Sequence, residues 1–325
     1  MYTRRKFLVS SAVAATGIGL TSCRDSVQAG TSVGTAAADE PAPTRADAPG
    51  AAMNVRAIPS TGEKLPVIGM GTSGSFEVGA SAAERDPLRE VLRRFLEGGG
   101  SVIDTAPTYS VAEDVMGELL ESQNLRKQAW LATKLSGVNG RAEGLAQFND
   151  TLRRLKAERV SLLQVHNLGD LKTQLGLARE LKAEGKVRYV GVTHYQDRAH
   201  DVIAAVLKSE KPDFVQINYS VASRNAEQRV LPTARDLGVA VLINRAFEDG
   251  RLFQHVAGKP LPDWAADAGI TSWAQAFLKF ALSHPAVTVV IPATGKPDRQ
   301  IDNLRAGTGP DLTEEQRQSL IKTLG

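Results

Sequence analysis

An acid and a phenol lie five positions apart in residues 101–110, where an apolar run ends in a turn. Asp104 closes the run, and Tyr109 follows just after Pro107. A strand that ends on a carboxylate and continues through a proline turn brings both side chains to the same rim. Both groups can give or take protons, so Asp104 and Tyr109 are the first candidates for catalysis.

Two further candidates follow apolar runs of the same kind. Lys134 comes directly after residues 130–133, and His166 comes directly after residues 162–165. Taken singly, a lysine after a strand is usually solvated and a histidine is usually a structural hydrogen-bonding residue. Together with Asp104 and Tyr109, they form a set that could work jointly if one fold gathers all four strand ends.

Apolar runs alternate with longer amphipathic runs from residue 53 onward. The expected strands are 65–70, 101–104, 129–133, 161–165, 187–192, 214–217, 240–244 and 287–291, with expected helices at 87–97, 144–155, 171–183, 201–208 and 272–282. Eight strands, each followed by a helix, predict a single α/β domain, a (β/α)8 TIM barrel over residues 53–325. In such a barrel the C-terminal ends of the strands meet at one face, so the four candidates would converge.

An open doubly wound sheet is the alternative, because residues 69–74 spell G-x-G-x-x-G. A dinucleotide-binding fingerprint of that kind opens directly into a helix, with an acid about 20 residues further on. Here the glycines run into a polar loop, and Asp104 lies further away. We therefore interpret them as a first barrel loop in which Gly71 and Thr72 let the backbone approach a cofactor.

The four motifs, in this order, resemble the aldo/keto reductase family over residues 57–325. The resemblance implies a (β/α)8 barrel that binds NADP without a Rossmann domain and a tetrad of Asp104, Tyr109, Lys134 and His166. Reduction of a carbonyl needs a hydride at the carbon and a proton at the oxygen. A phenol is a weak acid, with a pKa of about 10, and a neighbouring ammonium stabilises the phenolate.

The chemistry gives each tetrad residue a role. Tyr109 would deliver the proton, and Lys134 would be the ammonium beside it. Asp104 would pair with Lys134, because a lone buried charge is costly. His166 would donate a hydrogen bond to the carbonyl oxygen and orient it.

The resemblance also implies contacts to both ends of the cofactor. At the nicotinamide end it implies Thr193, His194 (where the family usually has Asn), Gln216, Asn244 and, toward the pyrophosphate, Arg245. At the adenine end it implies that the 2′-phosphate is held by the Thr294 hydroxyl, the Lys296 ammonium and the two-pronged guanidinium of Arg299. It places Asp302 and Asn303 at the adenine. NADP is the expected cofactor, and NAD stays possible.

The N-terminus has the features of an export signal. Arg4 and Arg5 precede an apolar run too short for a comfortable membrane span, and they resemble a twin-arginine (Tat) signal. Cys23, the single cysteine, ends a segment that resembles a bacterial lipobox, so residues 1–23 are expected to be a signal peptide with a possible lipid anchor. Residues 24–52 are expected to be a disordered linker rich in Ala, Gly and Pro. Soluble release after Ala29 is the alternative to lipidation.

These features predict an exported NADP-dependent reductase of an aldehyde or ketone, in the periplasm or anchored outside the cytoplasm. The expected partners are a carbonyl substrate and the Tat machinery, with the membrane reached only through Cys23. Without residues 1–23 the chain has no net charge, and no basic patch predicts nucleic-acid binding. No metal site and no paired carboxylates for a hydrolase are expected. The alternative is a cofactor-binding sensor or regulatory subunit with little turnover.

Overall fold

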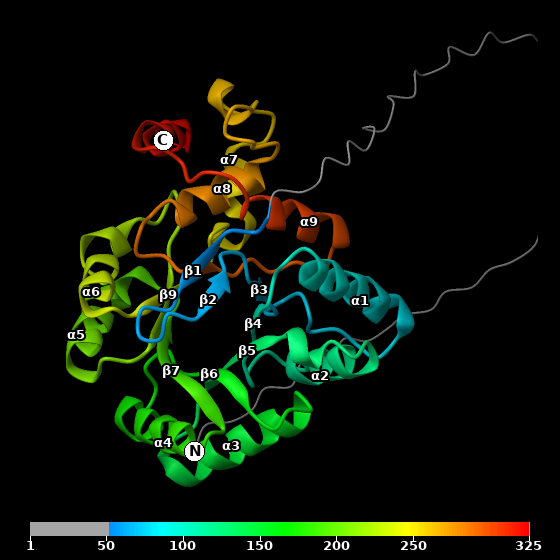
Figure 1. The fold of residues 1–325 in the computed structure, drawn as a ribbon, viewed down its shortest axis with the longest axis vertical. Coiled ribbons are helices and arrows are strands. Elements are labelled where there is room, and N and C mark those ends of the chain that lie inside the picture. The colour runs from blue at the N-terminus through cyan, green and yellow to red at the C-terminus, as the bar shows by residue number, and fades with distance from the viewer. Residues whose placement is uncertain (1–51, 325) are drawn as a thin grey trace, which may run out of the picture. The chain divides into compact units, whose positions relative to one another are not determined.

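A closed barrel of parallel strands forms the centre of the structure (Figure 1). The computed structural model describes residues 52–324. Each barrel strand pairs in parallel with the next one along the chain. The strands are β3 (Met70–Gly71), β4 (Val102–Asp104), β5 (Trp130–Leu135), β6 (Val160–His166), β7 (Val187–His194), β8 (Phe214–Asn218), β9 (Ala240–Asn244) and β10 (Val289–Val290).

The first and last strands meet and close the barrel. Parallel bridges join Ile68 to Val290 and Gly71 to Ala293. The backbone N–H of Gly71 donates to the carbonyl of Pro292 at 3.0 Å. Closure removes the free edges that an open sheet would leave, so the predicted (β/α)8 barrel is confirmed and the open doubly wound sheet is excluded.

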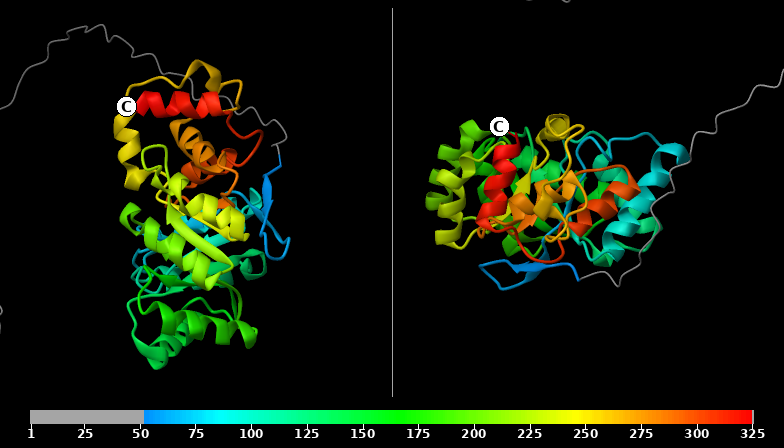
Figure 2. Two further views of the ribbon diagram at one scale, coloured as in Figure 1. Left: turned by 90° about the vertical axis from the view of Figure 1, so that its left-hand side faces the viewer. Right: turned by 90° about the horizontal axis from the view of Figure 1, so that it is seen from above.

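Helices follow the strands and cover the outside of the barrel (Figures 1 and 2). In α1, the buried residues Leu88, Val91, Leu92 and Phe95 recur at helical spacing and form one face. Burying each such side chain contributes roughly 1.5–3 kcal/mol. The helices are α1 (Ala82–Glu97), α2 (Ala112–Ser122), α3 (Gly140–Arg154), α4 (Leu171–Ala183), α5 (His200–Glu210), α6 (Val230–Leu237), α7 (Arg251–His255), α8 (Trp273–Leu282), α9 (Pro297–Arg305) and α10 (Glu314–Leu324).

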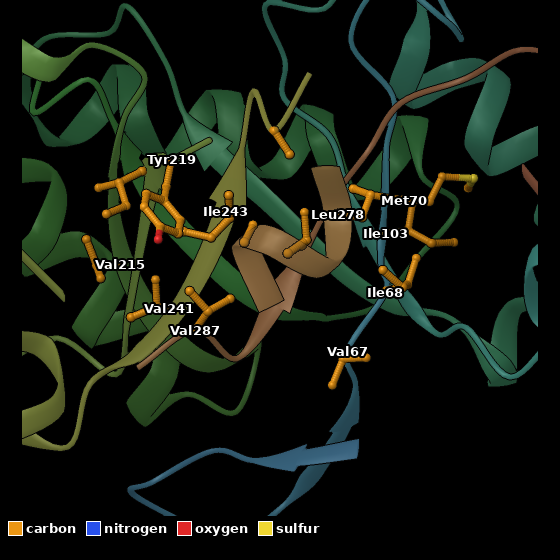
Figure 3. Close-up of a cluster of buried hydrophobic side chains, with 14 of the residues drawn as sticks. Val67, Ile68, Met70, Ile103, Val215, Tyr219, Val241, Ile243, Leu278 and Val287 are labelled. Atoms are coloured by element: carbon orange, nitrogen blue, oxygen red, sulfur yellow. The ribbon is translucent and has the colours of Figure 1, made fainter. Parts of the chain in front are cut away.

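The core lies in two layers, one outside and one inside the strand wall. In the outer layer, Leu278 of α8 belongs to the same buried cluster as Ile243 of β9 and Ile103 of β4 (Figure 3). The inner layer includes Trp130 and Phe214, whose ring centroids are 5.5 Å apart. An antiparallel hairpin of β1 (Val55–Ala57) and β2 (Lys64–Pro66) packs on this inner layer and covers the end of the barrel where the strands begin. The C-terminal ends of the barrel strands lie at the opposite end.

Two expectations about the strands need correction. The first strand, expected at 65–70, is divided between hairpin strand β2 and barrel strand β3. Lys134 and His166 do not follow their strands but lie within β5 and at the last position of β6. The expected signal peptide and all but the last residue of the expected linker lie outside the described residues.

Candidate active site

A cavity of about 1060 Å³ opens at the C-terminal ends of the barrel strands. Strand ends and the loops after them supply its wall, as the convergence of a (β/α)8 barrel requires. Of the sixteen residues predicted for catalysis and cofactor binding, all but Lys134, His194 and Lys296 line it. The thirteen that do are Gly71, Thr72, Asp104, Tyr109, His166, Thr193, Gln216, Asn244, Arg245, Thr294, Arg299, Asp302 and Asn303.

Lys134 and Asp104 form a buried ion pair beneath this cavity. The Lys134 Nζ donates to Asp104 Oδ2 at 2.7 Å and to the Thr105 carbonyl at 2.7 Å. Burial alone would lower the pKa of Lys134, but the negative charge of Asp104 and the Tyr109 phenol together raise that pKa above its ordinary value. Lys134 is therefore a cation at neutral pH, as its predicted role requires.

Tyr109 lies beside both Lys134 and His166. The Lys134 Nζ is 4.9 Å from the centre of the Tyr109 ring. The Tyr109 and His166 rings meet edge to face, with centroids 6.2 Å apart and planes at 84°. The predicted convergence of an acid, a phenol, an amine and an imidazole is thus present in the structure.

His166 is neutral over the physiological pH range. Burial, followed by the positive charge of Lys134, lowers the pKa of His166 to about 4. Its Nδ1 shares a hydrogen bond of 2.5 Å with the hydroxyl of Ser136, just beyond β5. A neutral imidazole keeps one N–H donor, which suits a residue that must bond a carbonyl oxygen.

Two glutamines donate hydrogen bonds to the Asp104 oxygen that does not contact Lys134. Gln216 was a predicted site residue, and Gln164 was not. Asp104 Oδ1 accepts from Gln164 Nε2 at 3.1 Å and from Gln216 Nε2 at 2.7 Å. The Gln216 Oε1 in turn accepts from Thr193 at 3.2 Å and from Asn244 at 3.3 Å. Gln216 was expected to bind the cofactor, and here its amide joins Asp104 to two other predicted cofactor residues. A lone glutamine inside the apolar run of β6 was the signal for Gln164.

The predicted phosphate and adenine residues lie around the start of α9. Arg299 is exposed at the cavity wall and Thr294 is buried in it, whereas Lys296 is exposed outside it. Both oxygens of Asp302 already accept hydrogen bonds, from Ser272 Oγ at 2.6 Å and from Gln275 Nε2 at 2.6 Å. Ser272 is also the N-cap of α8, so this network fixes α8 against α9.

His194 does not line the cavity, and its expected contact stays a prediction. Its Nδ1 accepts from the backbone N–H of Gln196 at 3.2 Å, and its ring stacks on Tyr195 with centroids 5.7 Å apart. The Arg245 guanidinium lies 5.5 Å from the centre of the Tyr195 ring. Four aromatic side chains that were not predicted as site residues line the cavity instead, namely Tyr195, Phe247, Phe253 and Trp273.

Comparison with known proteins agrees with this geometry. The sequence model of the aldo/keto reductase family matches residues 67–323, and the chain belongs to that family. It is 28% identical over 205 residues to aldo-keto reductase YhdN of Bacillus subtilis, covering 59% of this chain and 61% of that protein. It is 28% identical over 232 residues to methylglyoxal reductase YeaE of Escherichia coli, covering 70% of this chain and 80% of that protein.

Solved structures of similar proteins share the fold. An aldo/keto reductase from Klebsiella pneumoniae, solved with NADP and acetate, superposes with a TM-score of 0.70 at 28% identity. The match covers 80% of this chain and 92% of that one. An aldo-keto reductase from Klebsiella pneumoniae solved in complex with NADPH gives a TM-score of 0.68 at 28% identity.

The cavity wall fits a nicotinamide dinucleotide in three respects. The side-chain oxygen of Asn244 is buried without a hydrogen-bond partner among residues 52–324, so it can accept from a carboxamide N–H. Gly71 lines the cavity without a side chain of its own, and glycine is needed there because a Cβ would lie 3.0 Å from the Ile291 carbonyl across the barrel seam. Arg299 supplies a cation at the other end of the same cavity.

Within residues 52–324, no group of three or more His, Cys, Asp or Glu side chains is arranged to hold a metal ion. A helix of sufficient length and apolar character to span a membrane is not found in the same residues.

Proposed function

We propose that the chain is an NADPH-dependent reductase of aldehydes or ketones in which Tyr109 is the general acid. The observation that carries the proposal is the Lys134 ammonium, buried, paired with Asp104 at 2.7 Å and lying 4.9 Å from the Tyr109 ring centre. A fully buried cation stabilises negative charge beside it far more than a solvated one. Such a group is well placed to make a phenol act as an acid.

The residues divide the chemistry among them. NADPH, when bound, supplies the hydride that the carbonyl carbon receives. His166 donates a hydrogen bond to the substrate carbonyl oxygen, and Tyr109 delivers the proton to that oxygen. Lys134 stabilises the phenolate that remains, while Asp104 keeps Lys134 charged and in place.

NADP is the better fit of the two nicotinamide cofactors. Thr294 and Arg299 at the start of α9, with Lys296 nearby, provide a hydroxyl and two cations for a 2′-phosphate. The similarity to the Klebsiella enzyme, whose structure contains NADP, supports the same choice. Asn244 and Thr193 would hold the nicotinamide end.

The test is NADPH oxidation, followed by absorbance, against a panel of aldehydes and ketones. Tyr109→Phe should lower turnover by roughly 10²–10⁴-fold, the usual contribution of a general acid, while NADPH still binds. Tyr189→Phe is the matched control, because the Tyr189 hydroxyl bonds Thr61 at 2.9 Å at the hairpin end of the barrel. NADPH binding with no oxidation of any substrate would contradict the enzyme and favour the sensor.

We further propose that the chain is exported by the twin-arginine route. Arg4 and Arg5 ahead of a short apolar run support this, and that route carries folded proteins with their cofactors. Cys23 is the proposed lipid attachment site. Mass spectrometry of the mature N-terminus should find a lipidated Cys23, and Arg4→Lys with Arg5→Lys should retain the protein in the cytoplasm. An unmodified N-terminus beyond Ala29 would mean soluble release instead.

A further inference from the structure

Ser136 contacts His166 from outside the predicted tetrad. It lies one position past the end of β5, two residues after Lys134, and it is 3% exposed. Its Oγ is 2.5 Å from His166 Nδ1, and this is the one hydrogen bond of the Ser136 hydroxyl among the described residues. Strand β5, which ends just before Ser136, pairs with β6, which ends at His166.

The backbone of Ser136 is held in turn by Gln147 of α3. Gln147 Oε1 accepts from the Ser136 N–H at 2.8 Å, and Gln147 Nε2 donates to the Ser136 carbonyl at 2.9 Å. One side-chain amide thus satisfies both backbone groups of a residue that has just left the sheet. Because a loop residue with its backbone held on both sides has little freedom, the hydroxyl is aimed at His166.

The pairing distinguishes the two neutral forms of His166. If Nδ1 carried the proton, it would donate to Ser136 Oγ, and the buried hydroxyl hydrogen would have no acceptor within residues 52–324. Leaving a buried donor without an acceptor is unfavourable, because the donor has lost its hydrogen bonds to water. If the Ser136 hydroxyl donates to Nδ1 instead, both groups are satisfied and the ring proton lies on Nε2. The Nε2 has no partner among the described residues, and His166 lines the cavity.

We propose that Ser136 is a positioning residue that holds His166 in the Nε2–H form, so that its N–H points to the substrate carbonyl oxygen. This inference rests on the proposed reductase function for its consequence in turnover. It does not rest on that function for the pairing itself, which is a property of the folded protein.

The first test is nitrogen-15 NMR of the histidine rings in the full-length protein with NADP bound. The chain has five histidines, and the His166 signals are those that His166→Gln removes. The expected result is an unprotonated, hydrogen-bonded Nδ1 and a protonated Nε2 in the wild type, and a mixture of both forms in Ser136→Ala. A protonated Nδ1 in the wild type, or an unchanged spectrum in Ser136→Ala, would overturn the proposal.

The second test separates positioning from folding. Ser136→Ala should lower kcat roughly fivefold, the effect of losing one hydrogen bond of about 1 kcal/mol, with the Kd for NADPH unchanged by Trp fluorescence. Ser136→Thr, which keeps the hydroxyl, should restore most of the rate and the Nε2–H signal. Ser209→Ala, which removes a hydroxyl bonded to the Val206 carbonyl on α5, is the control and should match the wild type.

The outcomes keep the two proposals apart. Suppose that the wild type shows no reductase activity but Ser136→Ala loses the Nε2–H form of His166. The pairing of Ser136 with His166 is then supported, and the proposed reductase function is contradicted. If the wild type is active and Ser136→Ala turns over equally fast with the same NMR spectrum, the reductase function holds and the positioning role fails.

Discussion

Lys134 is a fully buried cation whose charge is balanced by one carboxylate at 2.7 Å. At the scale of single residues, such a pair contributes little net stability, yet removing one partner leaves an uncompensated charge inside the protein. The tetrad therefore has two separable properties, the stability of the buried pair and the positive charge that Lys134 places beside Tyr109. Substitutions can separate them.

Lys134→Met should abolish turnover and lower the free energy of unfolding by about 3–5 kcal/mol, because Asp104 is left buried and unpaired. The double variant Lys134→Met with Asp104→Asn removes both charges and should regain most of that stability while remaining inactive. Urea denaturation and NADPH oxidation measure the two effects. A double variant no more stable than Lys134→Met would show that packing, rather than charge, dominates.

Asp104, Lys134 and His166 were predictable because each ends or directly follows an apolar run, and a barrel brings such ends together. Tyr109 was predictable from its place in the turn after Asp104. Gln164 and Ser136 were not predicted. Which side chain meets which across a barrel depends on strand stagger and on the exact path of the chain after each strand, and neither is set by the local pattern of hydrophobic residues. It is thus harder to predict which side chains contact one another in the site than to predict which residues belong to it.

At the scale of elements, the position of β5 depends on how closely α2 and α3 approach it. Glu113 of α2 is buried and accepts from Thr133 of β5 at 2.8 Å and from Thr151 of α3 at 3.1 Å. Burial is the main reason that the pKa of Glu113 lies above its ordinary value, with the two hydroxyls opposing it. Gly117 allows this approach, since a Cβ on it would lie 2.0 Å from the Arg154 carbonyl.

Gly117→Ala should destabilise the protein by roughly 1–3 kcal/mol, because the methyl group forces α2 away from the end of α3. Gly176→Ala in α4 is the matched control: a Cβ there meets nothing within 4 Å, and the change should stabilise the protein by about 0.5–1 kcal/mol. Thermal unfolding of both variants measures the difference. Equal stabilities would mean that α2 moves without cost.

The predicted helices and strands agree best with the structure where one long periodic pattern belongs to a single element. The helix expected at 171–183 has the same bounds in α4. The strand expected at 65–70 was wrong because Leu65 pairs with Arg56 in the hairpin while Met70 pairs with Ile103 in the barrel. A continuous apolar run cannot reveal that its two halves join different sheets.

At the scale of the whole molecule, acid should weaken the fold through His166. Its folded pKa is about 4, below the ordinary histidine value of about 6.5, so the unfolded chain takes up the proton first. The stabilisation is complete above about pH 6.5 and is lost as the pH falls toward 4. Glu113 acts in the opposite direction, because its raised pKa favours the folded state at low pH.

Wild type should therefore lose on the order of 2 kcal/mol more unfolding free energy than His166→Gln between pH 7 and pH 4. Urea denaturation at several pH values measures this, and the contribution of Glu113 cancels because both proteins carry it. Parallel pH curves for the two proteins would place His166 in a more solvated setting than the one described.

The barrel seam has a consequence for biosynthesis. It joins Gly71 to Ala293, near the two ends of the described chain, and the residues at the start of α9 that face the cavity lie just beyond it. A nascent polypeptide can therefore neither complete the barrel wall nor retain a dinucleotide until the ribosome has translated past β10 and α9. Any growing chain that holds the dinucleotide has already been synthesised through both elements.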